Sequence, residues 1–463
     1  MSQSIIVSVG QAGNQIGTRF WDKVLLEHAK SNTKGVYDDA MSSFFRNVDP
    51  RRGRQCIPIG DGNGQIVGLR ARAVLVDMEE GVISQTMKTP LGELFDEHQR
   101  ITSNSGSGNN WAVGYAHYGP LYRETLLDSF RKEAEYCDSL QSFFMINSLG
   151  GGTGSGLGSY IMELLADEFP ETYRFSTVIC PSGDDDVVTS PYNSILSLAK
   201  HIEHADCILP IENQALFDIC DRITSKPETS TRKTNSAITD PGDKVFGGLV
   251  GPGAISKPKP WDAMNNIVAN LLLNMTSSMR FEGSLNVDIN DIVTNLVPFP
   301  RLKFLVSSMT PLFSLSDIRV PPRRLDQMFV DAFSRESQLI KADPKSNTYL
   351  ACALMVRGDV EISDVRRNID KMKATLRFAE WNQEGWKTGL CSQPALGQQF
   401  NLLTLANNCC ITTTLSEMRT RCLKLYNRRA NLHHYTPHIE LSQFKSSLQE
   451  TLNVIKQYNK HAK

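Results

Sequence analysis

"NSLGGGTGSGLGSY", residues 147–160, carries six glycines in fourteen positions and follows directly on the apolar run "SFFMI". The short apolar run predicts a buried strand, and the apolar spacing of "LGSYIMELLADEF" predicts a helix after it. The glycines therefore lie at a helix start, where unpaired backbone NH groups and the helix dipole favour an anion. Ser148, Thr153 and Ser155 add hydroxyl donors. The stretch predicts a phosphate cradle.

Two common phosphate-binding motifs do not fit this turn. The lysine of the GK[ST] signature is missing, and no choice of first glycine produces the dinucleotide fingerprint GxGxxG. A turn that uses glycine only for close helix packing is the alternative interpretation. Because five of the seven residues from 150 to 156 are glycine and follow a strand, we expect the cradle.

The first half of the chain alternates short apolar runs with helical patterns. The apolar runs are SIIVSVG, RAVLVDM, SFFMINS, RFSTVIC and CILPI. Runs of this length joined to helices predict βα units, which form a parallel sheet with helices on both faces. Such sheets bind ligands at the carboxyl ends of their strands. We assign residues 1–222 to this α/β domain, and expect its Gly-, Pro- and charge-rich segment 47–68 to be a surface loop.

The rest of the sequence divides into four parts. Residues 223–260 lack sustained periodicity and are interpreted as a polar insertion. Apolar residues spaced by three and four predict a central core helix over 261–281, which should lie between two domains. Mixed strand and helix patterns predict an intermediate α+β domain over 282–411. Residues 412–463 are predicted to form the C-terminal helices.

Composition excludes several classes of protein. With 463 residues, 40% apolar and 21% charged, the chain has the composition of a globular protein of two or three domains. Lys plus Arg (49) balance Asp plus Glu (50), which argues against a nucleic-acid partner. The sequence contains no apolar run long enough for a membrane span and no basic flank typical of a signal peptide. The ten cysteines form no CxxC pair and are interpreted as reduced thiols of an intracellular protein.

The glycine-rich turn is one of six motifs spread over nearly the whole chain. They are GQAGNQIG (10–17), SGSGNNWAVG (105–114), SLGGGTGSG (148–156), SPYNSILS (190–197), RFEGSLNVD (280–288) and NLVPFPRL (295–302). In this order they resemble the signature runs of the tubulin superfamily. SSFFRN, PSGDDDVVTSPYN and the long 223–260 segment are most similar to its epsilon type, the branch of centrioles and basal bodies. The resemblance implies a tubulin/FtsZ-like three-layer GTPase domain with a parallel sheet, a central helix, a second α+β domain and a C-terminal helical hairpin.

This resemblance implies that the α/β domain binds GTP or GDP with Mg²⁺. Gln11 and Gln15, beside the turn at Gly10, would reach the phosphates through their amides. Asn109 would close over the γ-phosphate together with the backbone of residues 106–108. The main cradle would consist of Ser148, Gly151, Gly152, Thr153 and Gly154.

The resemblance also implies which residues would bind the metal ion, the ribose and the guanine base. Asp77 and Glu79 would hold Mg²⁺ through water, as suits a hard cation beside a triphosphate. Asp186 would lie near the ribose. The guanine edge would be read by Asn213 and Asn265, and Trp261 would stack on its face. Taken alone, Asp77 or Glu79 is more typical of a solvated carboxylate, and Trp261 of a core residue.

Hydrolysis of GTP would need a group that orients the attacking water, and no evident base lies near the cradle in the sequence. The resemblance implies that this group comes from the neighbouring subunit, from an acidic position on a helix of the second domain. The chain reads NVDINDI there, which makes Asp291 the candidate catalytic residue for a neighbour's GTP. A solvated helix residue or a cap is the alternative interpretation of Asp291.

Two features separate this chain from lattice-forming tubulins. The segment FSLSDIRVPPRRL is shorter than their lateral-contact loop, and NVIKQYNKHAK lacks a glutamate-rich tail. We expect longitudinal contacts with delta-, alpha- or beta-type tubulin subunits, contacts with centriolar proteins, and no nucleic acid or membrane. The expected location is the cytoplasmic cytoskeleton, at the centriole, centrosome or basal body. A microtubule wall subunit of alpha/beta type and a delta-type tubulin remain alternatives, whereas the missing motifs argue against a self-contained hydrolase or dehydrogenase.

Overall fold

The computed structural model describes residues 2–32, 37, 39–49, 51, 56–59, 66–183, 187–225, 260–281, 283–312 and 324–462. Its largest sheet has six parallel strands in the order β6-β5-β1-β7-β8-β9. They are β1 Gln3–Val9, β5 Ala73–Asp77, β6 Arg100–Thr102, β7 Leu140–Ser148, β8 Tyr173–Cys180 and β9 Cys207–Glu212. Counted along the chain, these strands have the doubly wound order, in which the winding direction reverses beside the first strand. The carboxyl ends of β1 and β7 therefore flank a topological switch point.

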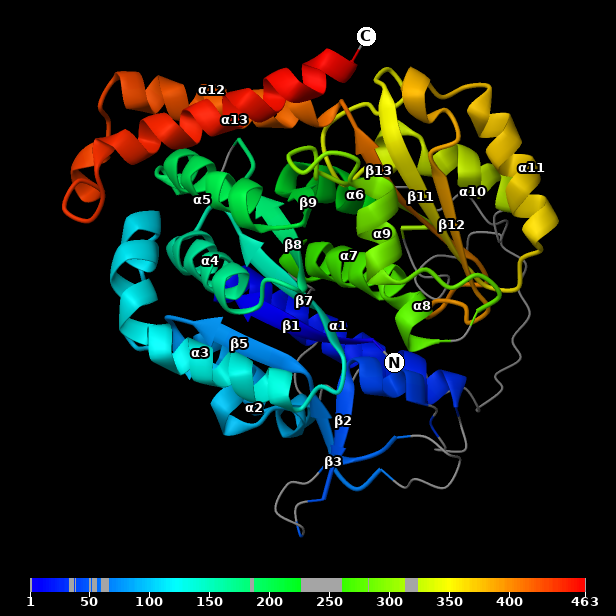
Figure 1. Cartoon of the computed structure of the whole chain (residues 1–463), viewed down its shortest axis with the longest axis horizontal. Coiled ribbons are helices and arrows are strands. Elements are labelled where there is room, and N and C mark those ends of the chain that lie inside the picture. Colours follow the sequence, from blue (N-terminus) through cyan, green and yellow to red (C-terminus); the bar gives the residue numbers. More distant parts are fainter. Residues whose placement is uncertain are drawn as a thin grey trace, which may run out of the picture.

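Helices cover both faces of this sheet (Figure 1). One face carries α3 Gly119–Glu135, α4 Gly158–Glu168 and α5 Ser190–His204, and the other carries α1 Gly10–Ser31, α2 Glu80–Met87, α6 Asn213–Ser225 and α7 Pro260–Met275. Successive side chains of β1 point to opposite faces, so Ile5 and Val7 join the core under α3 to α5, whereas Ile6 joins the core with α1 and α7. The three layers agree with the predicted α/β domain.

A second, smaller sheet follows α7. The chain passes through α8 Ser277–Arg280 and α9 Ile289–Leu296 into strands ordered β10-β13-β11-β12. These are β10 Val306–Thr310, β11 Tyr349–Arg357, β12 Trp386–Cys391 and β13 Asn401–Asn408, with α10 Leu325–Ala332 and α11 Ile362–Lys373 packed on one face. The two sheets meet where the NH of Ile208 donates to the carbonyl of Lys303 at 2.9 Å and the NH of Leu305 to the carbonyl of Ile208 at 2.8 Å.

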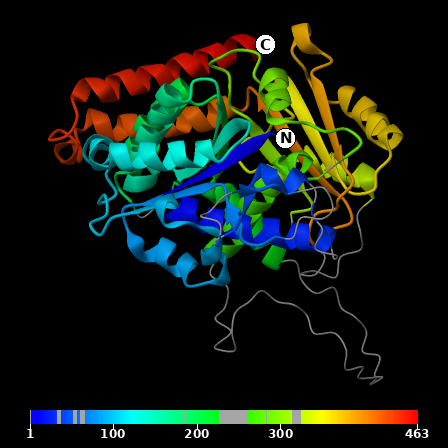
Figure 2. The same ribbon diagram turned by 60° about the horizontal axis from the view of Figure 1, so that its bottom comes forward.

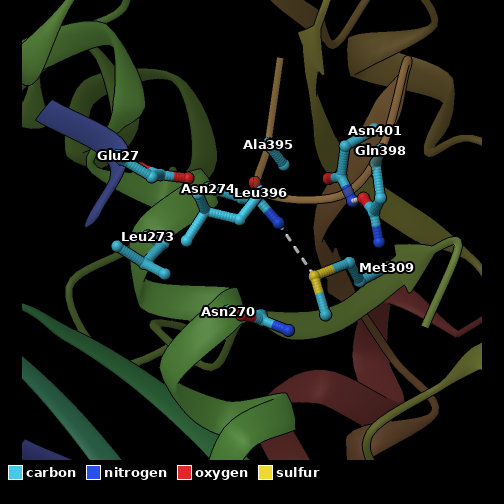
Figure 3. Close-up of a pocket in the computed structure, with 9 residues that line it drawn as sticks. All are labelled: Glu27, Asn270, Leu273, Asn274, Met309, Ala395, Leu396, Gln398 and Asn401. Carbon is cyan, nitrogen blue, oxygen red and sulfur yellow. Dashed lines mark hydrogen bonds between the residues drawn. The ribbon is translucent and has the colours of Figure 1, made fainter. Parts of the chain in front are cut away.

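Helix α7 lies between the two sheets, as expected for the central helix. A buried ion triad near its end ties the domains together, with Glu27 of α1 lying 2.7 Å from Arg280 and 2.9 Å from Arg357. Burial opposes ionisation of Glu27, but the two guanidinium groups outweigh it and lower the pKa of the carboxyl. Figure 3 shows the small pocket beside this triad, where Asn274 Nδ2 lies 2.9 Å from Met309 Sδ.

The C-terminal hairpin consists of α12 Ile411–Asn427 and α13 Leu441–His461. Both helices pack along α5, on the outside of the three-layer domain, and the turn between them projects past its end (Figures 1 and 2). Leu415 and Phe444 share a core with Ile195 of α5. The hairpin is therefore attached to the helix that follows β8 and not to the second sheet alone.

Two local predictions were wrong, and one strand was not identified from the sequence. Residues 47–48 and 56–57 of the expected surface loop belong to strands of a small sheet, with β2 Phe45–Val48 between β3 Cys56–Ile57 and β4 Leu69–Ala71. Its anchor is hydrophobic, because Phe45 packs edge-on against buried Trp21. The central helix ends at Met275 and α8 follows, and strand β12 falls in a stretch for which no strand was expected. Most of the 223–260 insertion and residues 313–323 lie outside the described residues.

The ten cysteines are free thiols, and all but Cys56, Cys137 and Cys220 are buried. Burial raises the pKa of most of these thiols, so they are poor nucleophiles. Across the described ranges, no helix combines the length and the apolar character that crossing a membrane requires.

Candidate nucleotide-binding site

Two predicted phosphate-binding segments touch at the switch point. Gly10, the first residue of α1, has a φ of +72°, and a Cβ on it would lie 2.9 Å from the backbone nitrogen of Gly154. Glycine is required there for its conformation and for this close approach. One turn later, Asn14 Nδ2 donates to the carbonyls of Gly10 at 2.9 Å and Val76 at 3.0 Å. The contact places the turn after β1 against the cradle after β7.

Polar side chains at the end of β7 and on α5 hold the backbone of the glycine-rich turn. Asn147 Nδ2 donates to the carbonyl of Gly154 at 3.0 Å and lies 3.2 Å from Nε2 of His201 on α5. Burial lowers the pKa of His201 to about 3, so the ring is neutral and Ser176 is its other partner, at 3.0 Å. Ser148 accepts a hydrogen bond from the NH of Gly150 at 3.2 Å. These bonds fix the backbone of the turn before any ligand arrives.

Two neighbouring glycines of the turn have different surroundings. A Cβ on Gly152 would lie 2.6 Å from the backbone nitrogen of Asn110, so the close approach of segment 105–110 requires glycine at this position. A Cβ on Gly151 would meet only Asn109 Oδ1, at 3.9 Å. The space in front of Gly151 is open and is bordered by the Asn109 side chain, where the prediction places a phosphate.

The segment 105–110 forms the opposite wall of this space. Gly106, Gly108 and Asn109 all have positive φ, at +59°, +56° and +52°. Ser107 Oγ lies 2.9 Å from Thr153 Oγ1, which ties the segment to the cradle. Left-handed residues in succession turn the chain sharply and leave Asn109 exposed at the tip.

The predicted metal residues lie beside that segment. Asp77, at the end of β5, is only 3% exposed, whereas Glu79 is exposed and rests against Gly106, whose added Cβ would lie 2.9 Å from Glu79 Oε1. Burial raises the pKa of Asp77 to about 7. Two carboxylates suit Mg²⁺, which keeps several waters and takes phosphate oxygens as further ligands. Within the described ranges, no three His, Cys, Asp or Glu side chains are grouped so that they could hold a metal ion.

The residues predicted for the base come from helices α6 and α7, and one of them contacts α1. Asn265 of α7 donates to Gln15 of α1 at 3.3 Å, which brings two predicted ligands together. Trp261, in the first turn of α7, is 56% exposed and therefore available for stacking, and it is not a core residue. Asn213 is half-buried at the start of α6, and Gln11 is exposed at the start of α1. Asp186, predicted to lie near the ribose, is outside the described residues.

One further residue organises the phosphate loops, and sequence reasoning did not single it out. Asn193 of α5 is fully buried, and its Nδ2 donates to the carbonyls of Asn109 and Gly150, both at 2.8 Å. Its Oδ1 accepts from the NH of Trp111 at 2.9 Å and from Tyr435 Oη at 2.6 Å. The residue lies inside the quoted run SPYNSILS, but the partners of its amide are distant in sequence.

The predicted catalytic residue, Asp291, lies near the amino ends of the strands, whereas the cradle lies at their carboxyl ends. Asp291 is the third residue of α9, and the neighbouring Asn290 accepts a hydrogen bond from Tyr173, the first residue of β8, at 2.6 Å. The cradle adjoins the other end of that strand, where the NH of Leu149 donates to the carbonyl of Ile179 at 3.0 Å. Six residue steps along a strand span roughly 20 Å. Asp291 therefore cannot reach a ligand in the cradle of its own subunit.

Taken together, the doubly wound sheet, the cradle at its switch point and the second α+β unit define a GTPase domain of the tubulin class. Residues 3–221 match the family described as "Tubulin/FtsZ family, GTPase domain", and residues 300–420 match "Tubulin C-terminal domain". The chain belongs to the tubulin family and is a GTP-binding tubulin.

The identities to individual tubulins indicate which branch of the family this chain resembles. The chain is 55% identical to the tubulin epsilon chain of Homo sapiens over 471 residues, covering 99% of this chain and 96% of that protein. Identity is 31% to the tubulin beta-2 chain of Suillus bovinus, over 100% of this chain and 96% of the relative, and 32% to the tubulin alpha-1 chain of Saccharomyces cerevisiae, over 94% and 92%. This chain is thus epsilon-like, which agrees with the resemblance predicted from its motifs.

Proposed function

We propose that GTP binds at the switch point with its phosphates in the open space between the cradle and segment 105–110. The observation that carries this assignment is the contact between Gly10 and Gly154 beside the open face of Gly151. Ser148, Gly151, Gly152, Thr153 and Gly154 would form the cradle. Gln11, Gln15 and Asn109 would complete the phosphate contacts. Guanine would lie on Trp261 beside Asn213 and Asn265, and Asp186 would serve the ribose.

Asp77 and Glu79 would hold Mg²⁺ through water. Their fit rests on the buried, high-pKa carboxyl of Asp77 at the strand end, because a cation beside it would offset the cost of its ionisation. The ion would supply charge neutralisation for the phosphates. The residues of this chain orient those phosphates and exclude solvent from the floor of the site.

We propose that GTP hydrolysis is completed between subunits. The cradle and Asp291 lie at opposite ends of the strands of one sheet, so a head-to-tail pair would bring Asp291 of one subunit to the GTP of the next. We propose Asp291 as the residue that orients water there. The partners in such a contact would be tubulin subunits of delta, alpha or beta type.

The cellular role that we propose is assembly or maintenance of centrioles and basal bodies, with a part in microtubule organisation at the centrosome. It is supported by the epsilon-like sequence and by the short segment after SSMTPL, which disfavours ordinary lateral packing. A wall subunit of alpha/beta type is the second candidate, and the 31% and 32% identities over nearly the whole chain favour it over an unrelated role.

Co-sedimentation with purified alpha/beta-tubulin separates these two roles. The chain is mixed with polymerising tubulin at increasing mole fraction, and its distribution along the microtubules is imaged with a fluorescent tag. Our proposal predicts little incorporation into the wall and, in dividing cells, label confined to centrioles and basal bodies. Uniform incorporation along the wall would replace the proposed role with that of a wall subunit.

A further inference from the structure

The turn of the C-terminal hairpin carries an unusual concentration of positive charge. Between Glu417 and Glu440 the sequence contains no Asp or Glu, although the whole chain has a net charge of −1. We call residues 424–438 the basic tip. Its exposed basic side chains are Lys424, Arg428, Arg429, His433, His434 and His438. Within the described chain, no ion pair involves Lys424, Arg428 or Arg429, in contrast to Arg421, which pairs with Glu417 at 3.6 Å.

Helix chemistry explains only part of this charge. Lys424 and Arg428 lie in the last turn and at the cap of α12, where cations are favoured by the helix dipole. Arg429, which has a φ of +52°, and the three histidines lie beyond the helix end. The positive charge of Arg429 therefore has no role in capping and is available to a partner, and the histidines add exposed hydrogen-bonding groups.

The basic tip rests on a rigid base. Tyr435 is fully buried and packs edge-on against Tyr192 of α5 and Phe444 of α13, at ring distances of 5.5 Å and 5.4 Å. The carbonyl of Ala430 accepts from Tyr192 Oη at 2.8 Å. Preorganised side chains lose less entropy on binding, so this base favours recognition over a merely solvated turn.

The same base is hydrogen-bonded to the phosphate loops. Tyr435 Oη donates to Asn193, whose amide holds the carbonyls of Asn109 and Gly150. Asn110 Nδ2 donates to the carbonyl of His434 at 2.8 Å. A shift of segment 105–110 on binding a γ-phosphate would therefore act directly on the backbone and the buried tyrosine of the basic tip.

We propose that the basic tip docks an acidic segment of a partner protein, and that the nucleotide changes its affinity through Asn193 and Tyr435. The second part rests on the proposed GTP site. An acidic peptide fits better than a nucleic acid, because the two tyrosines of the tip, Tyr426 and Tyr435, are half-buried and buried, and residues 424–438 contain no Phe or Trp on which bases could stack. It also fits better than a membrane, because none of the exposed large apolar residues lies between 424 and 438.

The docking is tested with a fluorescein-labelled oligoglutamate peptide at low salt, by anisotropy on the full chain. The variant Arg428→Glu combined with Arg429→Glu should weaken binding about tenfold, since charge reversal turns attraction into repulsion. Lys456→Glu combined with Lys460→Glu makes the same change of charge at exposed positions near the far end of α13 and should leave the affinity within about twofold. Equal affinities of the two double variants, or tighter tip-dependent binding of duplex DNA or phosphatidylserine vesicles, would overturn the docking proposal.

The coupling is tested by comparing GDP with a non-hydrolysable GTP analogue. Peptide affinity should differ several-fold between the two in the parent protein, about threefold to tenfold if the coupling is of ordinary size. Tyr435→Phe should reduce the difference at least about twofold, because it removes the bond to Asn193 and leaves the bond from Asn110 to His434. Tyr458→Phe, which also deletes a buried hydroxyl from the hairpin, should retain it, because Tyr458 bonds Asn407 and Phe304 and not the phosphate loops.

Measuring the nucleotide content of the same samples distinguishes a failure of the coupling from a failure of the proposed GTP site. Protein that holds guanine nucleotide but binds the peptide equally in both states would overturn the coupling and leave the GTP site intact. Protein without guanine nucleotide would contradict the proposed GTP site, while the charge-reversal comparison would still decide the docking.

Discussion

Asp291 Oδ1 lies 2.8 Å from Nζ of Lys387, a residue of strand β12. The other carboxylate oxygen accepts a long hydrogen bond from the NH of Asp288, at 3.4 Å, and the NH of Asp291 donates to Asp288 Oδ1 at 2.7 Å. The carboxylate that we propose for a neighbour's GTP is thus engaged within its own subunit. This pair would have to open before Asp291 could orient a water in a neighbour's site.

Substitutions of this pair should change GTP hydrolysis in opposite directions. Asp291→Ala should lower single-turnover hydrolysis about 100-fold under conditions where subunits associate, the ordinary size of a general-base contribution. Lys387→Met should raise the rate by releasing the carboxylate. Asp288→Asn keeps the cap acceptor and should change little. Undiminished hydrolysis by associated Asp291→Ala subunits would remove Asp291 from the mechanism.

Because Gly151 faces open space, a substitution there should change the affinity for GTP without changing the stability of the fold. Gly151→Ala should leave the free energy of unfolding within about 0.5 kcal/mol, because the added methyl finds open space. It should weaken GTP binding at least about tenfold, since the methyl would occupy the proposed phosphate position. Calorimetry and equilibrium binding measure the two quantities. Gly81→Ala, where the methyl also finds open space, is the control, and equal GTP affinities of the two variants would argue against the assigned phosphate position.

Removal of the Glu79 carboxylate should show whether Mg²⁺ contributes to GTP binding. Glu79→Gln should weaken GTP binding in Mg²⁺ while leaving binding in EDTA unchanged, because only the metal-dependent contribution requires this charge. The neighbour Glu80, also exposed, supplies the control Glu80→Gln. If Glu79→Gln lowers the affinity equally with and without Mg²⁺, then Glu79 acts on the nucleotide and not through a metal.

Stacking on Trp261 should contribute measurably to nucleotide affinity. Trp261→Ala should weaken binding about tenfold, because loss of aromatic stacking on a base costs about 1–3 kcal/mol. Trp261→Phe should retain most of the nucleotide affinity that Trp261→Ala loses. Trp381, 51% exposed in the second domain, is a comparable tryptophan away from the site. A Trp261→Ala variant that binds as tightly as Trp381→Ala would show that the base lies elsewhere.

Acid should destabilise the floor of the cradle through His201. Burial lowers its pKa to about 3 from the ordinary 6.5, so the unfolded chain takes up the proton first as pH falls. The stabilising contribution is complete above pH 6.5 and is lost as pH falls toward 3, at most about 1.4 kcal/mol per pH unit. His201→Gln should flatten this part of the stability profile, and His28, with a pKa of about 3, accounts for a remaining slope. The exposed His117→Gln should retain the full slope.

Local patterns predicted most of the fold because each element obeys its own periodicity. The short apolar run of β1 and the three-and-four spacing in α7 are visible without any tertiary information. The small sheet at Phe45–Val48 was missed because its strands are short and depend on packing against Trp21. Strand β12 has half-buried residues at Trp386 and Lys387, so it lacked the apolar run that predicts a strand.

The candidate site was predictable in its parts and not in its connections. Glycine content indicated the cradle, but only the structure distinguishes the packed Gly152 from the open Gly151. Asn193 was missed because its partners, from Asn109 to Tyr435, are dispersed along the chain. The pairing of Asp291 with Lys387 spans two elements whose approach no local pattern encodes.

The most direct test of the central claim is mass spectrometry of the nucleotide released when the purified full chain is denatured. A guanine nucleotide bound at the switch point predicts about one equivalent of GTP or GDP per chain in the parent protein, and a marked loss in Gly151→Ala that is folded by calorimetry. Folded parent protein that releases no guanine nucleotide, even after incubation with GTP and Mg²⁺, would contradict the claim.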